Sequence, residues 1–162
     1  MSMTPLAWLL GLFLPACGAS GAAGLPTPRL MDISHIDRPS SPNTALAAPA
    51  DFVPKPDIVT PRYAVAASKL YAEVLAVATG QARTYPAAEF PAQMQAHFVA
   101  RSAWLNFPDL VVAQVTAAGP DASTLVLYSR SVYGYGDFGV NQARVVTWLA
   151  ALDRTLNPAK ER

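Results

Sequence analysis

The sequence contains one cysteine, Cys17, and two histidines, His35 and His97, in 162 residues. A single cysteine excludes an intrachain disulfide. One cysteine and two histidines also do not form a metal-binding motif with a recognisable spacing. Charged residues make up only 14% of the chain and the formal net charge is +1. No stripe of Lys and Arg forms, as a nucleic-acid surface would require. We therefore predict no metal, no other cofactor and no nucleic-acid partner.

Recognisable catalytic patterns are also missing. No serine stands in a GxSxG elbow, which is the usual setting of an esterase nucleophile. Glu73 and Glu89 are interpreted as solvated side chains, and His97 is expected on the solvent-facing side of a strand. Whether the protein is an enzyme stays open, and the sequence favours a non-enzymatic protein. The 52% of hydrophobic residues exclude general disorder and predict a globular core.

The N-terminus has the pattern of a targeting segment. Leu6 to Ala16 is an uncharged apolar run of eleven residues, too short to span a bilayer but the length of a signal-peptide core. The following sequence, Leu14-Pro15-Ala16-Cys17, resembles the lipobox of bacterial lipoproteins, in which the cysteine is lipidated and becomes the first mature residue. We predict an exported, periplasmic protein anchored to the membrane through Cys17. An ordinary signal peptide cut near residues 19–23 and an uncleaved anchor remain alternatives.

The composition divides the chain into four segments. We expect a signal peptide with lipobox over residues 1–17, a flexible tether over 18–37, one domain over 38–157 and a tail over 158–162. Small residues and glycines dominate the tether. The domain begins with a proline-rich arm, which its prolines hold extended.

Hydrophobic periodicity predicts an α+β domain. Apolar residues at helical spacing indicate a helix over 66–79 and a second one opening near Asp137, with a stripe of Val145, Trp148, Leu149, Leu152 and Leu156. Strands are indicated over 93–101, 110–116 and 123–133, and weakly over 83–89. Short connections require antiparallel pairing. We predict two layers, an antiparallel sheet of three to five strands with two helices packed on one face.

A glycine-rich bend joins the last strand to the last helix. Gly134 to Gly139 reads GYGDFG and formally matches GxGxxG, the dinucleotide-binding turn. Only 23 residues follow Gly139, so the second βα unit of a mononucleotide fold has no room. We interpret the segment as a sharp bend in which Asp137 accepts hydrogen bonds from N–H groups at the start of the helix.

Three motifs resemble one bacterial family. They are the closing motif Ser129-Arg130-Ser131, Gly134-Tyr135, Asp137, Gly139-Val140-Asn141 and Arg144, the middle motif Arg101-Ser102 with Asp109, and the N-terminal motif Arg38 to Asn43. Together they are similar to the family called domain of unknown function 1499, over about residues 38–152. Many members carry a cysteine where this chain has Thr44. The resemblance implies an exported or membrane-anchored protein and supplies no reaction.

The motifs provide one candidate cluster, functional or structural: Arg101, Asp109, Arg130, Tyr135, Asp137, Asn141 and Arg144. In the structural interpretation an Arg–Asp network, with Arg130 and Asp137 as its clamp, pins the last helix to the sheet. In the functional one, Arg130 and the helix N-terminus bind a carboxylate or phosphate.

The leading functional hypothesis is a membrane-tethered envelope module that binds a small anionic ligand or an envelope protein. One alternative is an enzyme with an Arg/Asp/Tyr site at the bend. Another is an assembly factor whose arm, Pro39 to Thr60, binds another subunit.

Overall fold

The structure, a computed structural model, describes residues 14–157. Its helices are α2 (Pro15–Gly18), α3 (Ala67–Gly80) and α4 (Val140–Leu156), with short 3-10 turns η1 (Ile33–His35) and η2 (Pro91–Gln93). Its strands are β1 (Thr44–Ala48), β2 (Ile58–Val59), β3 (Thr84–Phe90), β4 (Gln95–Arg101), β5 (Pro108–Gly119) and β6 (Ala122–Ser131). Residues 1–13 and 158–162, which include most of the predicted signal peptide and the predicted tail, lie outside the described residues.

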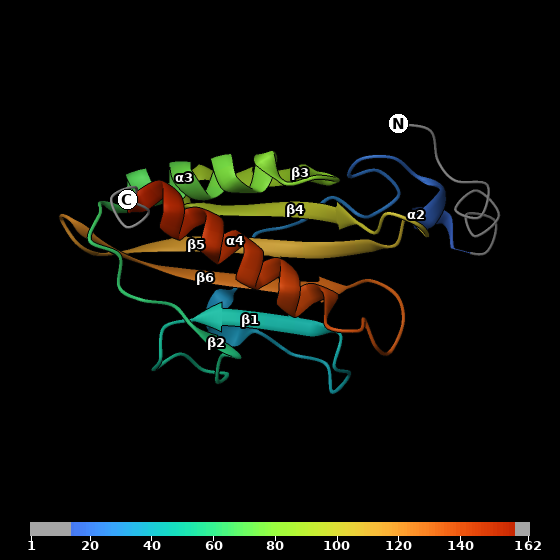
Figure 1. The fold of residues 1–162 in the computed structure, drawn as a ribbon, viewed down its shortest axis with the longest axis horizontal. Helices are drawn as coiled ribbons and strands as arrows, with labels where there is room; N and C mark the ends of the chain where they lie inside the picture. The colour runs from blue at the N-terminus through green and yellow to red at the C-terminus, as the bar shows by residue number, and fades with distance from the viewer. Residues whose placement is uncertain (1–13, 158–162) are drawn as a thin grey trace.

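One sheet organises the molecule, with strand order β2-β1-β6-β5-β4-β3 (Figure 1). The α+β class is confirmed, but the sheet has six strands, and β2 runs parallel to β1, so it is mixed rather than purely antiparallel. The two additional strands come from the proline-rich arm. They escape sequence patterning because β1 is a short run of small residues and β2 has only two residues.

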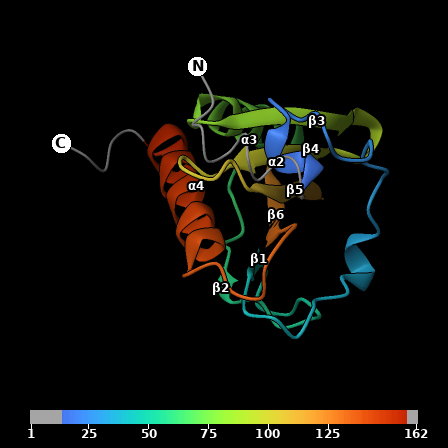
Figure 2. The same ribbon diagram turned by 90° about the vertical axis from the view of Figure 1, so that its right-hand side faces the viewer.

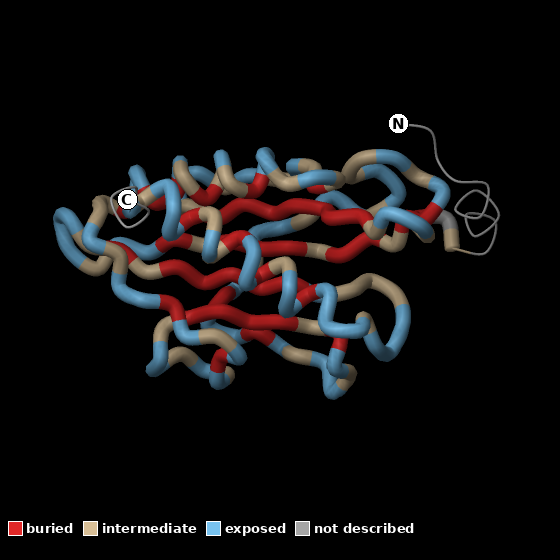
Figure 3. Tube along the Cα trace, viewed as in Figure 1, coloured by how far each residue is buried: buried red, intermediate tan, exposed pale blue. Residues whose placement is uncertain are grey.

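The helix face of the sheet carries the main core. α3 and α4 lie across this face (Figure 1), and the strands beneath them are almost continuously buried (Figure 3). Phe98 of β4 meets Trp148 of α4 edge to face, with ring centroids 5.6 Å apart. The expected stripe of α4 provides Val145, Trp148 and Leu152 to this core, which fixes the helix over β1 and β6.

The second face, which we call the open face, carries no long helix. Figure 2 shows η1 on the side of the sheet away from α4. A smaller core lies there, with Ile33 and Ile36 packed on Leu46, Val126 and Tyr128. Residues 18–37, predicted as a tether, therefore include segments that pack on the sheet.

Alternation along β6 sorts its side chains between the two faces. Leu125 and Leu127 belong to the core under the helices, whereas Val126 and Tyr128 belong to the core on the open face. Continuing the period of two directs Ser129 toward α4 and Arg130 toward the open face.

Candidate functional site

Asn141, at the start of α4, is the centre of a buried polar network on the helix side. Its side chain is fully buried. Its Oδ1 accepts hydrogen bonds from Ser129 Oγ (2.6 Å) and from Arg144 Nη1 (2.8 Å). Its Nδ2 lies 3.0 Å from the carbonyl oxygen of Asn43 and 2.9 Å from Ser131 Oγ. The network thus joins the residue before β1, the end of β6 and the start of α4 at one point.

A buried ion pair extends this network to β5. Arg144 Nη2 donates to Asp109 Oδ2 across 2.6 Å, and the two side chains are only 12% and 6% exposed. Desolvating both charges is costly, but an unpaired charge in the same place would cost more. The pair therefore makes the position of α4 on the sheet specific.

Asp137 holds the bend itself. Its Oδ1 accepts from the N–H of Gly139 (3.0 Å), and its Oδ2 accepts from the N–H of Asn141 (2.7 Å). Burial alone would raise the pKa of Asp137, but these N–H donors stabilise the carboxylate and lower the pKa overall. Gly134 and Gly139 have φ of 87° and 78°, the left-handed region that favours glycine. The glycines are used for a bend, as the sequence indicates.

Arg130 and Tyr135 do not join this network. Arg130 is exposed on the open face, and Tyr135 is 74% exposed. The predicted clamp between Arg130 and Asp137 is wrong, because strand alternation puts the neighbours Ser129 and Ser131 on the helix side and turns Arg130 away. The predicted anion site, which needs Arg130 beside the N-terminus of α4, is not formed for the same reason.

Arg101, the last residue of β4, lies outside the network around Asn141 and makes contacts of its own. It is 5% exposed, and its guanidinium donates to the carbonyl oxygens of Ala16 (2.6 Å), Gly21 (2.6 Å), Ala23 (2.7 Å) and Asn106 (3.1 Å). Burial lowers the pKa of Arg101 from its ordinary value. A buried cation surrounded by carbonyl oxygens fastens residues 16–23 to the sheet.

Cys17 lies within this fastened segment. Its carbonyl oxygen accepts from Asn106 Nδ2 (2.7 Å), as does that of Ala19 (2.8 Å). The side chain of Cys17 is buried, and burial raises the pKa of its thiol. The segment that the sequence singles out for processing is thus part of the packed molecule.

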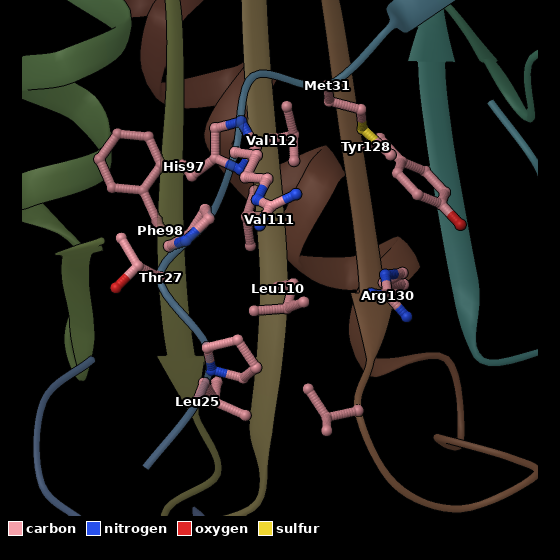
Figure 4. A pocket seen from close by; sticks show the side chains of 14 residues that line it. Leu25, Thr27, Met31, His97, Phe98, Leu110, Val111, Val112, Tyr128 and Arg130 are labelled. Atoms are coloured by element: carbon pink, nitrogen blue, oxygen red, sulfur yellow. The ribbon is translucent and has the colours of Figure 1, made fainter. Parts of the chain in front are cut away.

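A cavity of about 400 Å³ opens on the open face beneath residues 25–31, which we call the strap. Its floor consists of His97, Leu110, Val112, Tyr128, Arg130 and Val132. Figure 4 shows Leu110 at the centre of the floor, between His97 on β4 and Arg130 on β6, with the strap running past β4 and β5. Its lining is mostly hydrocarbon, and the charged residues that line it are Arg29 and Arg130.

Gln95 anchors the strap to the floor. Its Oε1 accepts from the Met31 N–H (2.8 Å), and its Nε2 donates to the Met31 carbonyl oxygen (2.9 Å) and to Gln114 Oε1 (2.6 Å). His97 Nε2 lies 2.7 Å from the same Oε1, so it carries the proton and donates. The amide of Gln95 is fully used, which holds one end of the strap in place.

His97 was expected to face solvent, and this expectation is wrong. It is 8% exposed, packs edge to face on Phe90 with centroids 5.5 Å apart, and burial lowers its pKa. Within residues 14–157 no group of His, Cys, Asp and Glu is arranged for a metal ion, and no helix there has the length and apolarity needed to cross a bilayer.

The network gathers residues from all three sequence motifs: Asn43 from the N-terminal motif, Asp109 from the middle one, and Asp137, Asn141 and Arg144 from the closing one. A family described as a protein of unknown function (DUF1499) matches residues 36–152. The chain belongs to the DUF1499 family. No curated protein and no solved structure matches it.

The DUF1499 match includes both candidate sites except for the strap. The polar network and the cavity floor fall inside residues 36–152, whereas the strap precedes them. Sequence reasoning missed the cavity, because its floor is made of ordinary strand residues such as Leu110 and Val112. One sequence pattern could have indicated that the predicted tether packs on the domain: it contains apolar residues such as Leu25, Met31 and Ile33.

Proposed function

We propose that this DUF1499 protein is an exported, membrane-tethered module that binds a small, largely apolar ligand in the cavity between the strap and the open face. The observation that carries the proposal is the cavity itself. Its volume of about 400 Å³ falls within the range of about 300–1,000 Å³ for small-molecule sites, and such sites combine an apolar lining with few polar groups.

Binding is favoured over catalysis because the polar residues at the bend already use their hydrogen-bonding groups within the protein. Asp137, Asn141 and Arg144 direct their hydrogen bonds to one another, to the backbone and to the side chains of Ser129, Ser131 and Asp109. Arg130 and Tyr135, the other members of the suggested enzymatic site, are exposed and make none of these hydrogen bonds. The enzymatic alternative therefore gains no support at the bend.

Binding can be tested with N-phenyl-1-naphthylamine, a neutral dye whose fluorescence rises in apolar surroundings. The purified protein in detergent-free buffer should bind it in a saturable manner. Leu110→Trp fills the centre of the floor and should abolish binding. Val146→Trp, on the exposed side of α4, is the control and should bind as the wild type does. Equal binding by both variants would place the dye elsewhere and contradict the proposal.

Export and tethering are supported by the apolar run before Cys17 and by the resemblance of residues 14–17 to a lipobox. Cleavage before Cys17 would remove the Ala16 carbonyl from Arg101 Nη1, but the Asn106 carbonyl would remain as its acceptor. Attachment of a lipid requires the buried Cys17 thiol to turn outward.

The location is tested by fractionating cells that express the full chain. We expect a processed protein in the membrane fraction, labelled by radioactive palmitate. Cys17→Ala should lose both the label and the membrane association, while Ala22→Ser, in the same segment, should keep them. An unprocessed protein that remains wholly in the cytosol would contradict export.

A further inference from the structure

The charged side chains that line the cavity, among the residues that the structure describes, are of one sign. Arg29 enters its lining from the strap and Arg130 from β6, and no carboxylate of the described part of the chain lines it. No salt bridge within residues 14–157 reaches either guanidinium. In contrast, Arg144 has a carboxylate partner at 2.6 Å. The cavity therefore has a positive border with no ion-pair partner among residues 14–157, although the carboxylates of Asp37 and Asp57 act on Tyr128, which also lines it.

The floor beside these charges is apolar. Leu110, Val112 and Val132 expose hydrocarbon to the cavity, and the ring of Tyr128 continues the surface toward β1. His97 adds no positive charge at neutral pH, because burial lowers its pKa from 6.5. A molecule that is complementary to both the apolar floor and the positive border needs an apolar body and one anionic group.

We propose that the ligand is an amphiphile with a hydrocarbon chain and a single anionic head, and that Arg130 recognises the head. This inference rests on the proposed function and names the ligand class of the same cavity. The chain lies on Leu110 and Val112 beneath the strap, and the head meets Arg130 at the border. A guanidinium presents a planar fork of N–H donors that matches carboxylate or phosphate oxygens in a bidentate manner.

Two kinds of ligand share this chemistry, a free fatty acid and a lipid with a phosphate head. Both leave their charged group in reach of water, as the exposure of Arg130 requires. A neutral molecule of the same length would keep the contact with the floor and lose the contact with Arg130. The head group can therefore be separated from the chain by experiment.

The test is a series of probes with one chain and different heads: dodecanoate, dodecyl phosphate and dodecanol. Each displaces N-phenyl-1-naphthylamine at pH 7.5, below its micellar concentration. We expect the better anionic probe to bind the wild type about tenfold more tightly than dodecanol, equal to about 1.4 kcal/mol. The order of dodecanoate and dodecyl phosphate then tells a fatty acid from a phosphate-headed lipid.

Arg130→Gln should remove this preference and leave the affinity for dodecanol unchanged. Arg154→Gln, an exposed arginine on α4, should preserve the preference and is the matched control. If dodecanol binds the wild type as tightly as the anions, or if Arg130→Gln keeps the preference, the head-group inference is overturned while the cavity proposal stands. If none of the three probes binds, both fail.

Discussion

Arg130 and Arg144 both belong to the closing motif, yet their guanidinium groups meet opposite surroundings. Arg144 lies between Asn141, Ser129 and Asp109, largely out of water. Arg130 borders the cavity on the other side of the sheet. The period of two along β6 accounts for the difference. Sequence proximity to the bend suggested a role for Arg130 in the bend, whereas strand geometry assigns it to the open face.

This contrast predicts two very different effects on stability. Asp109→Ala leaves the buried charge of Arg144 without its partner, and we expect the free energy of unfolding to fall by about 3–5 kcal/mol. Arg130→Ala removes an exposed charge, and the change should stay within about 0.5 kcal/mol. Urea denaturation followed by circular dichroism measures both. Similar losses for the two variants would contradict the assignment of Asp109 and Arg144 to the buried network.

His97 predicts a pH dependence of stability. Its pKa in the folded state is below 6.5 because of burial, so the unfolded chain binds more protons as the pH falls through this value. The contribution of neutral, buried His97 to the free energy of unfolding is fully present above about pH 6.5. It is lost as the pH falls toward the folded pKa of this residue. Thermal melts from pH 8 to pH 5 should show this decline, and His97→Gln should reduce it. An unchanged acid slope in the variant would count against a buried neutral His97.

At the scale of elements, the Met31 end of the strap is held in place by one side chain. Gln95 alone makes both hydrogen bonds to the backbone of Met31 and also accepts from His97. Arg101 holds the chain before the strap through the carbonyl oxygen of Ala23. Gln95 therefore attaches the Met31 end of the strap, and Arg101 attaches the chain just before its other end.

Removal of Gln95 should release the strap. Gln95→Ala leaves the Met31 backbone and His97 without their partner, and we expect trypsin to cleave after Arg29 at least several-fold faster, because local opening exposes the backbone to the protease. Gln142→Ala, on the exposed side of α4, should not change the rate. Mass spectrometry of the early fragments measures it. Equal rates for both variants would show that Gln95 does not hold the strap.

The elements differ in how well the sequence predicts them. α3 and α4 have amphipathic stripes, and β4, β5 and β6 alternate or are rich in valine, so each is found from its own pattern. β1 and the strap have no such pattern, because one is alanine-rich and the other is rich in proline. Their structure comes from distant partners: β1 pairs with β6, and the strap binds Gln95. The cavity depends on the strap and so could not be predicted.

At the scale of the whole molecule, the sheet separates the side with the family network from the side with the cavity. The side with α3 and α4 contains the main core and the network that joins the three family motifs. The open face has a strap, a smaller core and the cavity. In our proposal, the segment that leads to the membrane anchor is the same one that roofs the ligand site. Membrane attachment and ligand access would then involve one stretch of chain.

The most direct test of the proposed binding on the open face is methyl-resolved NMR of the protein during titration with dodecanoate. We predict that the methyl signals of Leu110, Val112 and Val132 shift in a saturable manner. Those of Val145 and Leu152, in the core beneath α4, should stay in place. Shifts confined to α4 and the bend at Asp137, with the floor methyl groups unchanged, would contradict the assignment of ligand binding to the open face.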